Sequence, residues 1–175
     1  MDFNLNRSLE ILSRTPEVLH QLLNGLSNEW INATEGENTW SPHTVLGHLI
    51  YADETNWVAR ARKILSDDDK RFVPFNRVAQ FELYNNKSME ELLKKFATVR
   101  ADSLKQLSAM QLNEKTLSLK GIHPDFGEVT LSQLLATWTA HDLDHINQIS
   151  RVMAKQYLDA VGPWKSFLGI LKRPI

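Results

Sequence analysis

Two histidines four residues apart, His141 and His145, have the spacing in this sequence that most suggests chemistry. Residues four apart on an α-helix differ by about 40° around its axis, so both imidazoles face the same way from successive turns. Two buried imidazolium ions would repel each other and resist desolvation. A divalent metal removes this conflict, because it binds neutral imidazole through one ring nitrogen. The pair therefore predicts part of a metal site, although paired histidines also occur on exposed helix surfaces.

A third histidine lies on a neighbouring predicted helix. Ser41 is a natural N-cap and Pro42 suits the first helical position, so a helix begins there and carries His48 on its apolar face. Three imidazoles complete a three-nitrogen site, and three protein ligands leave coordination positions open for water or substrate. The predicted inward stripe of the helix that carries the histidine pair consists of Leu134, Trp138, His141, His145, Gln148 and Val152.

The remaining candidate ligands favour simpler interpretations. His20 lies on a helical run without another ligand type nearby, which indicates a surface or hydrogen-bonded histidine. His123 precedes Pro124 in an irregular segment, where a structural or solvent-facing role is favoured over ligation. The run Asp67–Asp69 is interpreted as solvated charge at a helix end rather than a cation site.

Composition limits the class of protein. A length of 175 residues suits one domain, and a net charge of −1 gives no electrostatic argument for a nucleic-acid or anionic membrane partner. No apolar run reaches the ~20 residues of a membrane span, and the N-terminal residues lack the signal-peptide pattern, so a cytoplasmic protein is expected. The chain has no cysteine, so any metal site must use nitrogen and oxygen ligands, and a reactive thiol cannot come from the chain.

Apolar spacing predicts helical runs over 5–26, kinked or divided near Pro16, and from Pro42 to a polar end at 66–70. The connection from there to Lys87 has about twenty residues, which is long for a helix connection in a bundle. Within it, 78–81 is expected to form a short helix or to cover one end of the core.

Capping boxes predict the starts of the two later helices. Ser88 pairs with Glu91 and Thr130 pairs with Gln133. Between them, periodicity fails over 108–129, with an extended stretch expected near 116–119. Gly162 is predicted to end the last long helix, after which a short apolar helix begins at residue 163.

The order of these motifs resembles the DinB-like superfamily across nearly the whole chain. The residues that carry the resemblance are Trp40-Ser41-Pro42 leading into Gly47-His48-Leu49-Ile50, His123-Pro124 with Phe126-Gly127, His141-Asp142-Leu143-Asp144-His145 with Gln148, and Ala160-Val161-Gly162-Pro163-Trp164. The resemblance implies an all-α, DinB-like four-helix bundle as a single domain over 1–175, with a long connection between the second and third helices and a short C-terminal helix. It also implies a divalent metal, nickel or zinc, bound by His48, His141 and His145, and a homodimer.

The resemblance implies a small-molecule substrate but leaves several functions open. Members of the family include transferases and isomerases that use low-molecular-weight thiols, and others are labelled metal-dependent hydrolases. We expect a transferase that joins such a thiol to a small electrophile, since a bound metal would generate the reactive thiolate that this chain cannot supply. The alternatives are a hydrolase that uses the same metal and a non-enzymatic, metal-stabilised stress-response module.

Several residues near the histidines are expected to assist them. Tyr51 and Trp138, each within one turn of a histidine, are predicted to line the site, and Gln148 and Asp144 are candidates to accept a proton from a ligand ring. Family members often carry a glutamate at the position of Asp53. That residue lies about 140° around the helix from the nearest histidine, which argues against a role as general base.

Overall fold

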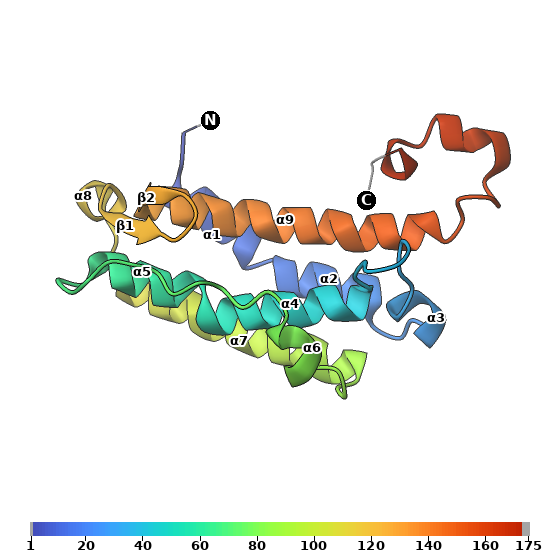
Figure 1. Cartoon of the computed structure of the whole chain (residues 1–175), viewed down its shortest axis with the longest axis horizontal. Coiled ribbons are helices and arrows are strands. Elements are labelled where there is room, and N and C mark those ends of the chain that lie inside the picture. The colour runs from blue at the N-terminus through green and yellow to red at the C-terminus, as the bar shows by residue number, and fades with distance from the viewer. Residues whose placement is uncertain (1, 173–175) are drawn as a thin grey trace.

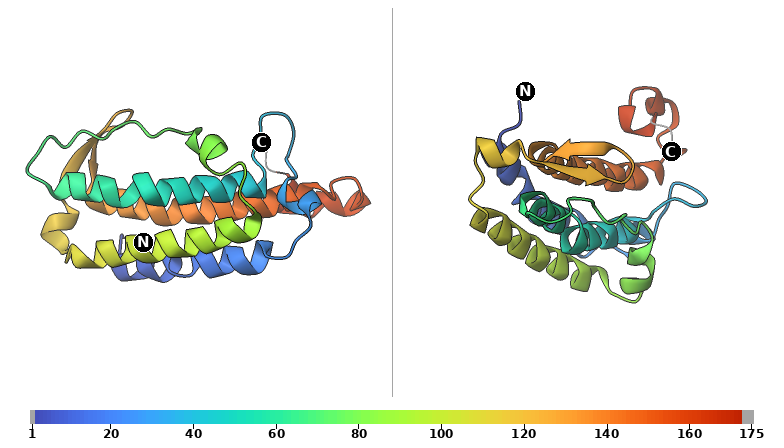
Figure 2. Two further views of the ribbon diagram at one scale, coloured as in Figure 1. Left: turned by 90° about the horizontal axis from the view of Figure 1, so that it is seen from below. Right: turned by 60° about the vertical axis from the view of Figure 1, so that its left-hand side comes forward.

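Helical rods lie side by side along the long axis of the computed structural model, which describes residues 2–172 (Figure 1). The rods are formed by α1 with α2, by α4 with α5, by α7 and by α9, as the two further views show (Figure 2). This arrangement confirms the predicted four-helix bundle. The elements are α1 (Leu5–Leu12), α2 (Thr15–Leu23), α3 (Asn28–Ile31), α4 (Pro42–Thr55), α5 (Trp57–Leu65), α6 (Ala79–Leu83), α7 (Met89–Ala109), α8 (Glu114–Leu117), β1 (Lys120–His123), β2 (Gly127–Thr130), α9 (Leu131–Lys155), and the 3₁₀ helices η1 (Gly162–Ser166) and η2 (Gly169–Leu171).

The predicted caps define where the site helices begin. The Ser41 hydroxyl accepts a hydrogen bond from the Thr44 backbone N–H at 3.2 Å, and Pro42 occupies the first turn of α4. Both expected capping boxes are present, at the starts of α7 and α9. Side-chain oxygens satisfy backbone N–H groups that the first turn of a helix leaves without partners. The helices that carry the histidines therefore start at residues that the sequence identifies.

Two of the rods are divided. The first separates into α1 and α2 near Pro16, as expected, and α2 begins at Thr15 with Arg14 as its N-cap. The second divides at Asn56, whose φ of −108° and ψ of −69° interrupt the helix between α4 and α5. Apolar spacing continues across this break, so the sequence pattern did not reveal it.

The segment before α9 departs from the prediction. The stretch 116–119 was expected to be extended, but its first two residues belong to α8, which begins with a further capping box formed by Asn113 and Thr116. An antiparallel hairpin follows, with Lys120 opposite Thr130 and His123 opposite Gly127. The all-α prediction therefore missed one short sheet.

The hairpin is seated on α5 by close packing at Gly121. A Cβ atom at this position would lie 2.6 Å from the Phe72 ring and 2.8 Å from the Ile64 side chain, so only glycine fits. Phe72 also donates its backbone N–H to the Ile122 carbonyl at 2.9 Å. This hydrogen bond joins the connection between α5 and α6 to the hairpin.

The C-terminal part also differs from the prediction. The last long helix ends at Lys155, before the expected glycine, and Gly162 begins η1 with a φ of +53°. Residues 157–172 leave the end of α9 and turn back over it, so that η2 lies beside α9 (Figure 1). Within residues 2–172, no helix is both long and apolar enough to cross a membrane.

Candidate metal centre

The three predicted ligands come together between α4 and α9. The Nε2 atom of His141 lies 3.1 Å from the Nε2 atom of His48 and 3.1 Å from that of His145. One nitrogen from each ring falls within a group whose members are all within 4.8 Å of one another. Two turns of α9 supply His141 and His145, as their spacing predicted, and α4 supplies His48 from the opposite side.

Burial keeps these imidazoles neutral. Burial first, and then the positive charge that a protonated neighbouring imidazole would carry, lower the pKa of His48 to about 3 and that of His141 to about 2. The pKa of His145 is also lowered by burial, although its hydrogen bond with Gln148 opposes the shift. A neutral imidazole has a free ring nitrogen lone pair, which is the form that binds a metal.

The geometry fits a divalent metal. Nitrogen ligands about 2.0–2.1 Å from a tetrahedral zinc are about 3.3 Å apart, close to the two Nε2 separations of 3.1 Å. Gln148 Oε1 lies 2.7 Å from Nδ1 of His145, so Nδ1–H can donate there and leave Nε2 free for a metal. This contact confirms the expected partner of His145. Nδ1 of His48 and Nδ1 of His141 are buried without a hydrogen bond in the described structure.

A buried ionic network holds the ligand helices in register. Arg100 of α7 is 1% exposed and binds Asp53 of α4 and Asp142 of α9, with its hydrogen bonds to the two carboxylates at 2.5–3.1 Å. It also donates to the Leu12 carbonyl at 2.9 Å. Because Asp142 follows His141 directly in the chain, this network fixes the helix turn that carries a candidate ligand.

The network is electrostatically unbalanced, because one guanidinium faces two carboxylates. Burial raises the pKa of Asp53 to about 6, and the attraction of Arg100 only partly opposes that shift. Burial alone would lower the pKa of Arg100, but the two carboxylates raise it overall. Asp53 and Asp142 are therefore committed to Arg100 rather than to the histidine cluster.

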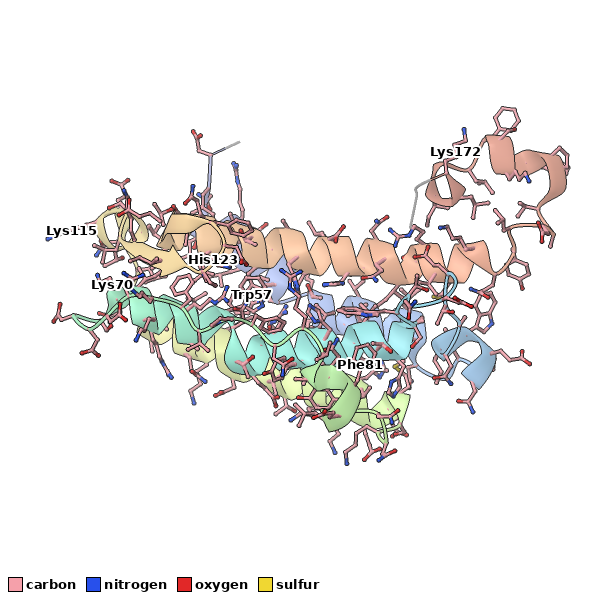
Figure 3. All side chains as sticks on the ribbon, in the orientation of Figure 1. Trp57, Lys70, Phe81, Lys115, His123 and Lys172 are labelled. Atoms are coloured by element: carbon pink, nitrogen blue, oxygen red, sulfur yellow. The ribbon has the colours of Figure 1, made fainter. Side chains whose placement is uncertain are left out.

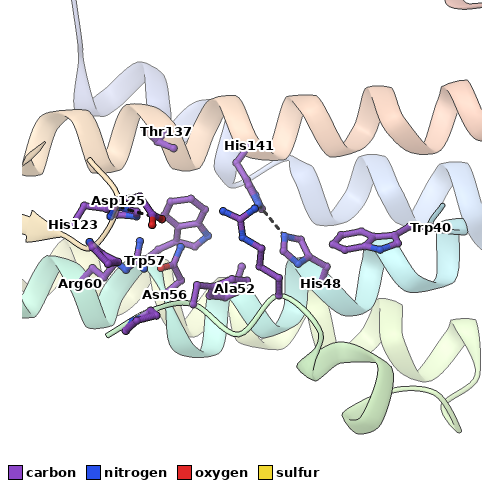
Figure 4. A pocket seen from close by; sticks show the side chains of 14 residues that line it. Trp40, His48, Ala52, Asn56, Trp57, Arg60, His123, Asp125, Thr137 and His141 are labelled. Carbon is purple, nitrogen blue, oxygen red and sulfur yellow. Dashed lines mark hydrogen bonds and ion pairs between the residues drawn. The ribbon is translucent and has the colours of Figure 1, made fainter. Parts of the chain in front are cut away.

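A cavity of about 460 Å³ opens beside the cluster. Figure 4 shows His48, His141 and Trp40 toward one end, and His123, Asp125 and Arg60 toward the other. The Trp40 ring lies 4.9 Å from the ring of His48. The cavity thus connects the candidate metal ligands with the hairpin. The lining residues are Trp40, His48, Ala52, Asn56, Trp57, Arg60, Pro74, Phe75, Arg77, His123, Pro124, Asp125, Thr137 and His141.

The aromatic residues that line the cavity differ from those predicted. Trp138 is fully buried and stacks on Trp57 with ring centroids 5.8 Å apart, so Trp57 lines the cavity in its place. Tyr51 faces a separate cavity and packs against Phe75 at 5.2 Å. Trp57 directly follows the break at Asn56, and its ring lies between α5 and α9 (Figure 3).

The remaining sequence candidates divide into cavity and surface residues. His20, Asp144 and the run Asp67–Asp69 are exposed, and none of them is in the three-histidine group. His123 is not in that group either, but it lines the cavity, a role that its position in an irregular loop did not indicate. Its Nδ1 accepts the Asp125 backbone N–H at 3.1 Å, so a neutral His123 carries its proton on Nε2.

The comparisons with known proteins agree with this fold. A family model described as the DinB superfamily matches residues 11–149. YfiT from Bacillus subtilis, described as a probable metal-dependent hydrolase with an unusual four-helix bundle topology, is similar over 86% of each chain, with 16% identity and a TM-score of 0.72. A four-helix bundle protein, TT2238, is similar over 87% of this chain and 98% of its own, with 22% identity and a TM-score of 0.55. No curated protein sequence matches the chain.

Proposed function

The chain belongs to the DinB superfamily, and from its three converging histidines we propose that it is a metal-dependent enzyme that transfers a low-molecular-weight thiol to a small electrophile. The observation that carries the proposal is the position of His48 and His141, which are held neutral and face a cavity large enough for a small molecule. We propose His48, His141 and His145 as ligands of one divalent ion, zinc or nickel.

A thiol suits this site because it needs little help from a general base. A divalent metal held by His48, His141 and His145 would lower the pKa of a thiol bound beside it and so favour the reactive thiolate. Asp53 and Asp142 are both paired with Arg100, so neither carboxylate is free to accept a proton at the cluster. The sulfur forms a bond to the electrophilic carbon as a leaving group departs, and the thiol proton passes to solvent. Trp40 and Trp57 line the cavity and give it apolar surface that can contact the electrophile.

Hydrolysis is the second candidate, and Asp125 is the observation that favours it. This carboxylate lines the same cavity and could accept a proton from water. YfiT, whose fold is similar, is described as a probable metal-dependent hydrolase. In Figure 4, however, Asp125 lies beside His123, toward the end of the cavity away from His48. This separation of Asp125 from His48 favours thiol transfer over hydrolysis.

The two reactions are separated by their requirement for a thiol. Zinc- or nickel-loaded protein is incubated with a chlorodinitrobenzene electrophile and glutathione or bacillithiol, and in parallel with nitrophenyl esters without thiol. We expect thiol-dependent conjugation that is lost in His145→Ala and kept in the control variant Asp67→Ala, whose side chain is exposed and lies outside the cluster and the cavity. Ester hydrolysis without conjugation would replace the transferase with the hydrolase, and the absence of both reactions would contradict an enzymatic function on these substrates.

We also propose that the protein forms a homodimer through its C-terminal segment. Tyr157, Trp164 and Phe167 are exposed large apolar residues, and the side chain of Phe167 is 85% accessible to solvent. Exposed apolar groups of this size in one segment are typical of an association surface. Covering them with a second copy of the segment would remove this surface from water.

A further inference from the structure

Two arginines line the cavity that begins at the histidine cluster. Arg60 belongs to α5, and Arg77 belongs to the connection between α5 and α6. Within residues 2–172, neither guanidinium lies within ion-pair distance of a carboxylate, whereas Arg100 and Arg151 both have such partners. Cationic side chains on a cavity wall without an anionic partner are available to bind one.

The pKa shifts of the nearby histidines indicate which part of the cavity each arginine affects. Burial, then the positive charge that a protonated His145 would carry, and then the charge of Arg77 lower the pKa of His48. Burial and then the charges of Arg60 and Arg77 lower the pKa of His123. Arg77 is therefore within electrostatic reach of both the candidate metal ligands and the hairpin, while Arg60 acts on the hairpin end, where Asp125 attracts it.

The cavity carries an excess of positive charge. Its lining contains two guanidinium groups and one carboxylate, Asp125, which gives a net charge of +1 before any metal binds. Burial lowers the pKa of Arg60, which shows that its charge is incompletely solvated. A planar guanidinium binds carboxylate or phosphate through paired hydrogen bonds, and these are among the stronger polar contacts in proteins.

We propose that Arg77 and Arg60 form a subsite for an oxyanion group, carboxylate or phosphate, on the substrate of this enzyme. The subsite rests on the proposed function, because it assigns the reacting end of the same molecule to His48 and His141. The Nε2–H of His123 provides a further donor on this wall. The enzyme then selects anionic substrates, and the distance between the subsite and the cluster sets which atom of the substrate reacts.

The two arginines differ in how cleanly they test this subsite. Arg60 also donates to the Val73 carbonyl at 3.3 Å and lies 5.0 Å from the centre of the Phe72 ring, so its replacement alters local packing. The side chain of Arg77 is exposed and makes no hydrogen bond within the described residues, so Arg77→Gln should fold as the wild type does. Arg62 is exposed on α5 and lies outside the cavity, so Arg62→Gln is the matched control for loss of one charge.

The experiment measures binding of inorganic phosphate, acetate and malonate to zinc-loaded protein by isothermal titration calorimetry. We expect saturable binding of at least one anion, weakened about tenfold or more in Arg77→Gln and in Arg60→Gln but unchanged in Arg62→Gln, because each lost guanidinium removes hydrogen bonds to a charged group. The anion that binds most tightly identifies whether carboxylate or phosphate is preferred.

Equal affinities in all four proteins, or no saturable binding at millimolar concentrations, would overturn the subsite. Binding that is lost in His145→Ala but unchanged in Arg77→Gln would assign the anion to the metal instead and would also overturn it. Failure of the proposed function is recognised separately. In that case anion binding would still depend on Arg77, while neither thiol conjugation nor ester hydrolysis would occur in the wild type.

Discussion

Replacing Arg100 with methionine should destabilise the protein severely, because it leaves two buried carboxylates without their cation. Arg100 is 1% exposed, and Asp53 and Asp142 surround it within hydrogen-bond distance. Removing one partner of a buried ion pair costs about 3–5 kcal/mol, whereas total domain stability is about 5–15 kcal/mol. Methionine approximates the volume of the arginine stem, so the loss measures the charge rather than a cavity.

The loss should depend on pH in a defined direction. Without Arg100, burial and the nearby Asp142 carboxylate hold the folded-state pKa of Asp53 still further above its unfolded value of about 3.9. A raised carboxyl pKa preserves stability below the unfolded value and removes it as the pH rises through the folded value. The difference in unfolding free energy between wild type and Arg100→Met should therefore be larger at neutral pH than near about pH 5.

Urea unfolding followed by far-ultraviolet circular dichroism measures this difference. The exposed control Arg62→Met should change the free energy of unfolding by less than about 0.5 kcal/mol. Combining Arg100→Met with Asp53→Asn and Asp142→Asn should recover most of the loss, since no uncompensated charge then remains buried. A loss below about 1 kcal/mol in Arg100→Met, or one that does not vary with pH, would refute the argument that this network is charged and buried.

Three further predictions concern the cluster, the hairpin and the C-terminal segment. In metal-free protein, the free energy of unfolding should fall as the pH drops below about 6.5, by up to about 1.4 kcal/mol per pH unit for each of His48 and His141. The reason is that a lowered folded-state pKa makes the unfolded chain bind more protons than the folded chain. Urea titrations should show a shallower pH dependence in His141→Ala. Gly121→Ala should cost about 1–3 kcal/mol by overpacking and weaken malonate binding, whereas Gly169→Ala, which faces open space, should do neither in thermal unfolding and calorimetry. Phe167→Ser should shift the proposed dimer toward monomer in sedimentation velocity, and an unchanged sedimentation coefficient would assign the interface elsewhere.

The sequence predicted the histidine cluster because spacing along a helix determines the direction in which each side chain points. Residues four apart share a face wherever they lie along a helix, so His141 and His145 point the same way on α9. Ser41 fixes where α4 starts, and the apolar stripe of that helix predicts the face that carries His48. Gln148 lies within hydrogen-bond reach of His145 for the same reason, since residues three apart are neighbours on a helix.

The cavity could not be predicted in the same way, because its walls depend on irregular backbone. The break at Asn56 places Trp57 on the wall where Trp138 was expected, and apolar periodicity carries no sign of that break. His123 reaches the cavity through a hairpin that is only a few residues long. Arg77 lies in a connection without repeating structure, so its position relative to the cluster follows only from the folded chain.

The partner of Asp53 could not be predicted from sequence periodicity either. Asp53 itself points away from the cluster, in agreement with its angular distance from His48 along α4. The residue that Asp53 binds, Arg100, is buried among apolar residues of α7, a helix that carries no candidate ligand. A long-range ion pair of this kind depends on the register between two helices, which only tertiary packing sets.

Metal content combined with X-ray absorption spectroscopy tests the central claim most directly. Protein purified without an affinity tag, or reconstituted with zinc or nickel, should contain about one metal per chain with imidazole nitrogens at about 2.0–2.1 Å. The metal should be lost in His145→Ala while the helical circular dichroism signal remains. A wild-type protein that binds neither metal after reconstitution, or a His145→Ala variant with an unchanged absorption spectrum, would contradict the assignment of His48, His141 and His145 as its ligands.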